Sequence, residues 1–152
     1  GDLMFLEKLD QQNIVQISWL GKMNEDPEIK EFLGKIDSTT YLENCFLLKE
    51  IEKSIYIGFI TYSNPVDTIA GKTISIYYAI HPNYRYQGYG SVLLNLFIEE
   101  MLSSYSVDKL VLNIKKENQA SQRLALKCGF QCVFEDDEDW IFLKDGKRKK
   151  TL

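Results

Sequence analysis

The feature that most constrains this chain is a junction between a strand-like run and a helix-like run, joined by a turn with two glycines. Thr73 to Ile80 is rich in β-branched and aromatic residues and is followed by Pro82, which predicts a strand that ends there. From Ser91 to Ser103, apolar residues recur at helical spacing. The turn therefore opens a helix, whose first backbone N–H groups lack partners and whose dipole is positive at that end. Because Gly88 and Gly90 carry no side chain to keep a phosphate away, the junction predicts a site for a phosphorylated ligand.

Two well-known phosphate-binding motifs do not fit this loop. A mononucleotide P-loop needs a longer glycine gap followed by Gly-Lys-Ser/Thr, and neither the gap nor the lysine is present. A dinucleotide fingerprint needs three glycines and an acidic residue about 20 positions later. Only two glycines are found here. The loop therefore indicates another class of phosphate site.

The loop does resemble motif A of the GNAT acetyltransferase superfamily, R/Q-x-x-G-x-G/A, which reads here Arg85-Tyr86-Gln87-Gly88-Tyr89-Gly90. A second block resembles motif B, in which a strand and an Asn precede a short helix that ends in Lys-x-Gly-Phe. The matching residues are Asn118, Ser121, Leu124, Lys127, Gly129 and Phe130. A plain helix stop, with Gly129 as a left-handed cap and Phe130 in the core, also explains the Gly-Phe pair, and both interpretations can hold together. With both blocks in the right order, the chain is identified as a member of this superfamily over residues 73 to 134.

The order of elements predicts an α/β chain (α+β mixed sheet), and the resemblance implies a GNAT-like fold. The resemblance implies a central mixed, mostly antiparallel sheet of six to seven strands with helices on both faces. Strands are expected at Leu3 to Leu9, Cys45 to Glu50, Ser54 to Tyr62, Thr73 to Ile80, Leu110 to Ile114, Gln131 to Phe134 and Trp140 to Leu143. Helices are expected at Gln11 to Leu20, Pro27 to Leu33 with Asp26 as cap, Ser91 to Ser103, and after Asn118. Asn64 to Lys72 is expected to be a polar loop.

Length and composition fit a single domain, and the resemblance implies one GNAT acetyltransferase domain over residues 1–152. A chain of 152 residues and 17.7 kDa suits a single domain with its own core. No apolar run approaches the roughly 18 residues that cross a bilayer, and the N-terminus lacks the layout of a signal peptide, so a cytoplasmic location is expected. Cys45, Cys128 and Cys132 have no partners that would complete a zinc set. We expect no metal, and three reduced thiols that mostly pack.

The charge is unevenly distributed. The segment from Lys144 to Leu152 has a net charge of +4, so the rest of the chain carries −8 within the total of −4. We expect this tail to be solvated and partly frayed. An acidic body favours cationic amines over nucleic acid as partners. The run Glu135 to Asp139 is either a solvated turn or a rim that attracts a cationic amine.

The resemblance implies acetyl-CoA as co-substrate and assigns most of its contacts to the backbone. The N–H of Tyr78 would face the thioester oxygen, and Ile80 would pair with the pantetheine arm. The pyrophosphate would lie across the N–H groups of Arg85, Tyr86, Gln87, Gly88, Tyr89, Gly90 and Ser91. Asn118 of motif B is assigned to the same cofactor. The Arg85 side chain would add a charge-assisted contact or simply pack outward.

The side-chain catalysts depart from the family pattern. The Tyr that protonates the leaving thiolate in many members is aligned with Ala125, and the Glu that serves as base is aligned with Ile74 or Ser75. Ser121 is a candidate for orienting the leaving sulfur or a water, although a small residue that lets the cofactor approach explains it equally well. Candidates on the strand are Tyr77 and Tyr78.

The resulting hypothesis is an acetyl-CoA dependent N-acetyltransferase acting on a primary amine of a small molecule or a protein N-terminus by direct attack on the thioester. The alternative is a CoA-binding module with little or no catalytic activity. We expect neither nucleic acid nor a membrane as partner, and a homodimer is left open. The sole histidine, His81, is expected to end a strand rather than to act as a catalyst or a metal ligand.

Overall fold

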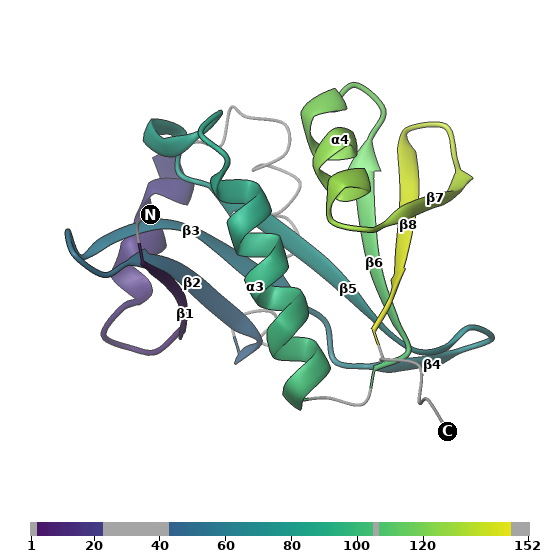
Figure 1. Cartoon of the computed structure of the whole chain (residues 1–152), viewed down its shortest axis with the longest axis horizontal. Coiled ribbons are helices and arrows are strands. Elements are labelled where there is room, and N and C mark those ends of the chain that lie inside the picture. The colour runs from purple at the N-terminus through teal and green to yellow at the C-terminus, as the bar shows by residue number, and fades with distance from the viewer. Residues whose placement is uncertain (1–2, 23–42, 105–106, 147–152) are drawn as a thin grey trace. The chain divides into compact units, whose positions relative to one another are not determined.

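The computed structural model of the protein describes residues 3–22, 43–104 and 107–146 (Figure 1). Within these ranges the chain packs as two compact units. The first unit draws on residues 1–63 and 77–93, and the second on residues 64–76 and 94–152. Strand β5 (Gly71–Ile80) and helix α3 (Tyr89–Ser104) each contribute residues to both units. The helix expected at Pro27 to Leu33 and its cap Asp26 lie outside the described residues.

Antiparallel strands form the body of the first unit. They are β1 (Met4–Lys8), β2 (Cys45–Glu50) and β3 (Ile55–Tyr62). The predicted hairpin between β2 and β3 is confirmed, and its register places Leu47 opposite Phe59. Glu50 is buried at the turn, where its carboxylate accepts hydrogen bonds from the amides of Glu52 at 3.0 Å and Lys53 at 2.8 Å. These two bonds compensate for the burial of the carboxylate.

The core of the first unit follows the alternation of β2 and β3. One cluster joins Ile17 to three buried strand residues, Cys45, Leu47 and Phe59. Leu48 and Ile60, which alternate with these residues along the strands, have no exposed surface either. Because successive side chains of a strand point to opposite faces, both faces of this part of the sheet are covered. The element that carries Ile17, the helix η1 (Ile14–Lys22), supplies the cover on one face.

The helix η1 differs from the helix expected over Gln11 to Leu20. It is a 3₁₀ helix, and it begins only at Ile14. The reason lies in a reciprocal pair just before it. The Asp10 carboxylate accepts from the amides of Gln12 and Asn13 at 2.8 Å each, while the Asn13 side-chain oxygen accepts from the Asp10 amide at 2.7 Å. These bonds hold residues 11–13 as a turn, so the helix starts after them.

The second unit is also built mainly from antiparallel strand pairs. Its strands are β4 (Val66–Thr68), the first part of β5, β6 (Lys109–Lys115), β7 (Gln131–Glu135) and β8 (Asp139–Asp145). The β4–β5, β6–β8 and β7–β8 pairs are antiparallel, whereas β5 and β6 pair in parallel over Thr73 to Ser75. The strand order is β1-β2-β3-β5-β6-β8-β7, with β4 on β5. The predicted mixed, mostly antiparallel sheet is confirmed.

The described residues form eight strands where six to seven were expected, and β4 is the addition. It lies in the stretch that the sequence suggested was a polar loop, Asn64 to Lys72. Gly71 adopts a φ of 105° at the turn between β4 and β5, and the hydroxyls of Thr68 and Thr73 lie 3.1 Å apart across the pair. All three residues of β4 are exposed, so the sequence has no alternation of apolar and polar residues there that would predict a strand.

The predicted tail does not begin where the charges suggested. Strand β8 continues through Lys144 to Asp145, and the Gly146 amide donates to the Asp108 carbonyl at 2.9 Å. Asp145 also forms an ion pair with Lys109. The expectation of a frayed segment was therefore wrong for residues 144–146, because strand pairing and an ion pair hold them. Residues 147–152 lie outside the described part of the chain.

The cysteines differ in their surroundings. Cys45 and Cys128 are buried, whereas Cys132 is exposed, so the expectation of packing fits two of the three. Burial raises the pKa of the Cys45 thiol to about 12, which keeps it protonated at neutral pH. Within the described ranges, no three His, Cys, Asp or Glu side chains gather as a metal site would require. The helices of that same part of the chain include none long and apolar enough to span a membrane.

Candidate cofactor site

The loop between β5 and α3 belongs entirely to the first unit. After β5, the short 3₁₀ helix η2 (Pro82–Tyr84) follows His81, which caps it by accepting a hydrogen bond from the Asn83 amide at its Nδ1, at 3.1 Å. Pro82 sits in the first turn, where its missing N–H costs nothing. Helix α3 then begins at Tyr89, two residues earlier than predicted. Tyr89 and Gly90 are therefore part of the first helical turn rather than of the loop.

The backbone of this loop offers an open approach to amide groups. Gly88 has a φ of 87°, and a Cβ placed on it would meet no atom within 4 Å. The Val92 amide bonds to the Gly88 carbonyl at 3.4 Å, so the N–H groups of Tyr89, Gly90 and Ser91 precede the first helical bond of α3. Such groups at the positive end of a helix dipole are suited to a phosphate. The geometry thus fits the anion that the sequence predicted.

Along β5, the backbone N–H and C=O groups of successive residues point alternately to the two edges of the strand. The Tyr77 carbonyl accepts from the Thr61 hydroxyl at 3.5 Å, and the His81 amide donates to the Ile57 carbonyl at 2.7 Å, so both face β3. Alternation along a strand places the backbone groups of Tyr78 and Ile80 on the opposite edge of β5. These are the two residues that the family resemblance assigned to the thioester and the pantetheine arm.

Arg85 connects the loop to that edge of β5. Its Nε donates to the Ile80 carbonyl at 2.9 Å. This bond shows a structural use of the guanidinium that the sequence left open, because it closes the loop onto the end of the strand. A guanidinium has further N–H groups, so the bond does not exhaust its donors.

Gly58 of β3 is a contributor that sequence reasoning missed. A Cβ on this residue would lie 2.5 Å from the Ala79 carbonyl oxygen and 3.2 Å from the Ile80 Cα. Only glycine therefore lets β3 pass this close to the part of β5 that leads into the loop. An isolated glycine inside a strand-like run was the available signal, since such a residue often marks a close backbone approach.

Aromatic rings support the start of the loop. The His81 ring lies 5.1 Å from Trp19 of η1 and 5.5 Å from Tyr84, and Tyr84 lies 6.4 Å from Tyr89. Burial, and secondarily the charge of Arg85, lowers the pKa of His81. The neutral ring is thus favoured, with Nδ1 as acceptor for the Asn83 amide. These contacts describe a structural histidine.

The lowered pKa of His81 predicts a pH dependence of stability. The unfolded chain binds this proton more readily than the folded one, so the contribution of the neutral ring is present above about pH 6.5 and is lost as pH falls through the folded-state pKa. The variant His81→Asn can accept the same amide bond at i+2 without titrating. We expect the melting temperature of the wild type to fall more steeply than that of His81→Asn between about pH 7 and about pH 5. Parallel curves would contradict this role.

Motif B lies in the second unit and builds the ends of helix α4 (Gln119–Lys127). The Asn118 side-chain oxygen accepts from the Ser121 amide at 3.1 Å, which makes it the helix cap. At the other end, Gly129 has a φ of 91°. Phe130 is buried, and its amide donates a hydrogen bond to the Ala125 carbonyl at 2.9 Å. The helix-stop interpretation of the Gly-Phe pair is thus confirmed. Ala125 is fully buried, so its position belongs to the core of the unit.

The side chains suggested as catalysts occupy different surroundings. Tyr77 packs against the cluster of the first unit around Ile17 and Phe59. Tyr78 follows it on β5, so its side chain points to the other face of the strand. Ser121 lies in the first turn of α4 in the second unit, where it is half-buried. Tyr77, Tyr78, Ile80 and the loop are brought together within the first unit, whereas Asn118 and Ser121 share the second.

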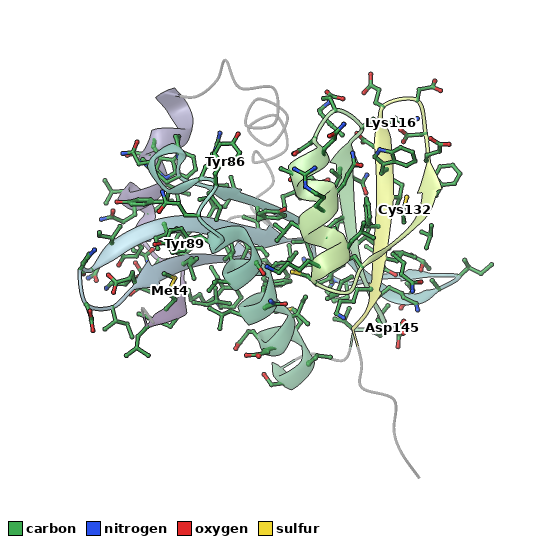
Figure 2. The ribbon with its side chains drawn as sticks, turned by 45° about the horizontal axis from the view of Figure 1, so that its top comes forward. Met4, Tyr86, Tyr89, Lys116, Cys132 and Asp145 are labelled. Atoms are coloured by element: carbon green, nitrogen blue, oxygen red, sulfur yellow. The ribbon has the colours of Figure 1, made fainter. Side chains whose placement is uncertain are left out.

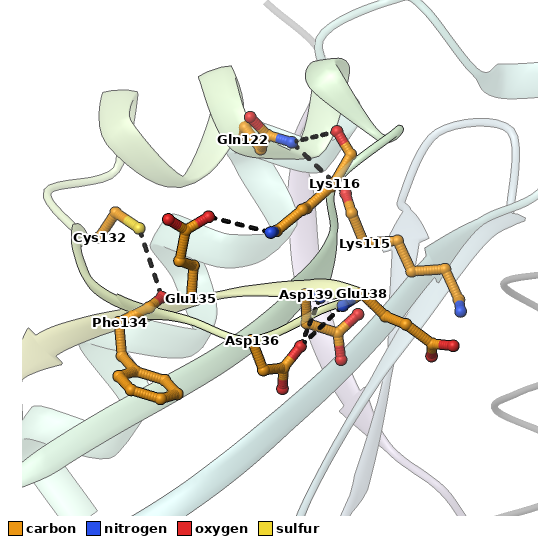
Figure 3. Close-up of polar contacts among 9 residues, drawn as sticks. All are labelled: Lys115, Lys116, Gln122, Cys132, Phe134, Glu135, Asp136, Glu138 and Asp139. Atoms are coloured by element: carbon orange, nitrogen blue, oxygen red, sulfur yellow. Dashed lines mark hydrogen bonds and ion pairs between the residues drawn. The ribbon is translucent and has the colours of Figure 1, made fainter.

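The acidic run of the second unit is an ordered turn (Figure 3). The Asp136 carboxylate accepts from the amides of Glu138 at 3.0 Å and Asp139 at 2.7 Å, and the bond from Asp139 is the main cause that lowers the pKa of Asp136. Lys116 forms an ion pair with Glu135 at 2.9 Å. The run therefore has a structural use as the connection between β7 and β8, beside any attraction it exerts on cations.

Comparisons with known proteins agree with this geometry. The profile described as Acetyltransferase (GNAT) family matches residues 12–130. Among solved structures, a GNAT-family acetyltransferase from Bacillus anthracis is 12% identical, with a TM-score of 0.73 over 96% of this chain and 97% of that one. No significant match was found among curated protein sequences.

Two further structural neighbours have ligands in their crystals. Spermidine N-acetyltransferase from Vibrio cholerae, in complex with CoA and spermine, is 13% identical, with a TM-score of 0.73 over 94% of this chain and 95% of that one. N-acetyltransferase PseH from Campylobacter jejuni, in complex with acetyl coenzyme A, is 21% identical, with a TM-score of 0.63 over 94% and 99%. At these identities, the likeness establishes the fold.

Proposed function

The chain belongs to the GNAT family of acetyltransferases and is an acyltransferase, and from this we propose that it transfers the acetyl group of acetyl-CoA to a primary amine of a small molecule or a protein N-terminus. The observation that carries the proposal is the open backbone around Gly88, next to the first-turn amides of α3. Family membership, with the acetyl-CoA complex of the PseH neighbour, supports the choice of donor.

The proposed contacts with the donor are made by the backbone of the first unit. The pyrophosphate lies across the N–H groups of the segment from Arg85 to Ser91, where no side chain on Gly88 obstructs it. Since the Arg85 amide already donates to the Pro82 carbonyl at 3.5 Å, the contacts come from the amides that follow it. The pantetheine arm follows the edge of β5 that Tyr78 and Ile80 face. Since the Ile80 carbonyl already accepts from Arg85, the arm would meet the Ile80 N–H rather than its carbonyl.

The proposed reaction is direct acyl transfer. The neutral amine attacks the thioester carbonyl carbon, the C–N bond forms as the C–S bond breaks, and CoA leaves as the thiolate. The proton that the amine loses ends on solvent or on this thiolate, which becomes the thiol of CoA. Negative charge develops on the carbonyl oxygen, and a preorganised N–H at Tyr78 would stabilise it. Ala125 has no proton to donate in this step. Tyr77, which packs against the cluster of the first unit, stays a candidate that the variants below test.

We propose a cationic amine of the polyamine type as the first acceptor class to test. The charge of −8 outside the basic end of the chain favours cations, and the Vibrio cholerae neighbour is a spermidine acetyltransferase. The test is thiol release from acetyl-CoA with polyamines, aminoglycosides and short peptides with free N-termini, against a blank without acceptor. Release that exceeds the blank with one class identifies the acceptor. Release equal to the blank throughout the panel would favour a CoA-binding module.

The side-chain candidates give a prediction about turnover. We expect Ser121→Ala, Tyr77→Phe and Tyr78→Phe each to retain turnover within about 10²-fold of the wild type, because backbone groups, positioning and solvent carry the chemistry. The measurement is the turnover rate at saturating acetyl-CoA, with the affinity for CoA as control. A loss beyond about 10²-fold in one variant, with CoA affinity unchanged, would identify that residue as the acid and contradict the expectation.

We also propose that residues 1–152 function as one catalytic domain, which is supported by structural neighbours that match 94% or more of the chain. The contribution of Asn118 to the cofactor stays a prediction, and its side-chain oxygen is already used to cap α4. The cytoplasmic location and the homodimer also stay predictions.

A further inference from the structure

Tyr86 combines two unusual properties. Its side chain is 96% exposed, and its backbone has a φ of 61°, in the left-handed region that residues with a Cβ rarely adopt. Among the described residues, none donates a hydrogen bond to its ring or hydroxyl or stacks on it. Tyr89, three positions later, is instead held against Tyr84. The Tyr86 side chain therefore does not stabilise the fold, although a tyrosine is unfavourable in this conformation.

The neighbourhood of Tyr86 indicates what its ring can serve. Gly88, whose Cβ position has no atom within 4 Å, lies two residues away. The first turn of α3 begins at Tyr89, and Figure 2 shows Tyr86 in the loop that leads into this helix. An unfavourable backbone conformation at such a place is a reason to look for a function. Asparagine or glycine would adopt the same φ at lower cost, so the property that distinguishes tyrosine here is its exposed aromatic face.

We propose that the Tyr86 ring stacks on the adenine base of CoA. The inference rests on the proposed function, in which the pantetheine arm follows the β5 edge at Tyr78 and Ile80 and the pyrophosphate lies at the loop. In CoA the adenosine follows the pyrophosphate on the side away from the pantetheine, so it extends past the loop on the side opposite to the β5 edge. An exposed aromatic ring on the loop matches a flat base, which binds by its face without needing a specific hydrogen bond.

The test compares two variants with the wild type by calorimetric titration with CoA. Tyr86→Phe keeps the ring, and Tyr86→Asn removes it while tolerating a positive φ. We expect CoA affinity to stay within about twofold in Tyr86→Phe and to fall by about 5- to 100-fold in Tyr86→Asn. The melting temperature of ligand-free Tyr86→Asn should equal or exceed that of the wild type, by up to about 4 °C, because the strained residue is gone.

A second ligand identifies the part of CoA that the ring contacts. 3′,5′-ADP carries the adenine, the ribose, the 3′-phosphate and the first phosphate of the pyrophosphate but no pantetheine, and its affinity should fall in Tyr86→Asn by the same factor as that of CoA. The proposal is overturned if Tyr86→Asn binds CoA as the wild type does, or if Tyr86→Phe loses as much affinity as Tyr86→Asn. It is also overturned if Tyr86→Asn binds 3′,5′-ADP as tightly as the wild type does, or if the wild type does not bind 3′,5′-ADP at all. Failure of the wild type to bind CoA would instead refute the proposed function.

Discussion

Replacing Gly88 with valine is expected to lower the affinity for CoA by more than about 100-fold. The Cβ position of Gly88 faces open space, so the valine methyl groups would occupy the volume that the pyrophosphate needs rather than clash with the protein. Each tenfold loss corresponds to about 1.4 kcal/mol, so this prediction asks for about 3 kcal/mol of lost binding. Calorimetric titration with CoA measures it directly.

The φ of 87° at Gly88 requires a control, because valine at this angle strains the backbone whatever the space around it. Gly88→Asn tolerates a positive φ and also carries a Cβ, so it separates strain from obstruction. Both variants should lose CoA affinity, whereas only Gly88→Val should show a marked fall in melting temperature without ligand. CoA binding at wild-type affinity by a folded Gly88→Val protein would refute the proposed phosphate site.

Gly58→Ala is expected to destabilise the protein and to weaken CoA binding together. The added Cβ would lie 2.5 Å from the Ala79 carbonyl oxygen, a backbone atom that moves only if β5 moves away from β3. Overpacking of this kind costs about 1 to 3 kcal/mol, which lowers the melting temperature by about 3 to 10 °C in a chain of this size. Since Ala79 and Ile80 lead into the loop, CoA affinity should fall by about tenfold or more.

The double variant Gly58→Ala with Ile80→Val tests which contact matters. Ile80→Val removes the Cδ1 atom that lies 3.0 Å from the new Cβ but leaves the Ala79 carbonyl in place. We expect it to restore less than half of the lost melting temperature. Full recovery would show that a flexible side chain, rather than the strand backbone, limits the space at Gly58.

The elements that sequence analysis predicted well carry their signals locally. The β2–β3 hairpin follows from two apolar runs and a short turn, and the ends of α4 follow from Asn118 and Gly129. Strand β4 was missed because its three residues are all exposed and are fixed by pairing with β5 rather than by their own pattern. The extension of β8 to Asp145 was missed for a related reason. The basic residues from Lys144 onward suggested a solvated tail, whereas pairing of Asp145 with Lys109 makes this segment part of the strand.

The candidate site was predictable in position but not in chemistry. Two glycines before an apolar helix locate the loop, because glycine is needed where a ligand approaches the backbone. The groups proposed to act on the thioester are amides, which every residue except proline carries, so no side-chain pattern reveals them. Tyr86 shows the same limit, because its left-handed conformation contradicts the preference of its residue type. The need for glycine at position 58 becomes clear only from the structure, in which the β5 backbone lies too close to allow a Cβ there.

The most direct test of the account is the melting temperature of the wild-type chain with and without CoA. A ligand present at about 100 times its dissociation constant stabilises the folded state by about 2.7 kcal/mol. For a chain of this size, that corresponds to a rise of about 5 to 10 °C. The account predicts this rise with CoA in the wild type and its loss in Gly88→Val. A melting temperature that stays unchanged with several millimolar CoA would contradict the assignment of the loop as the site that binds the acetyl donor.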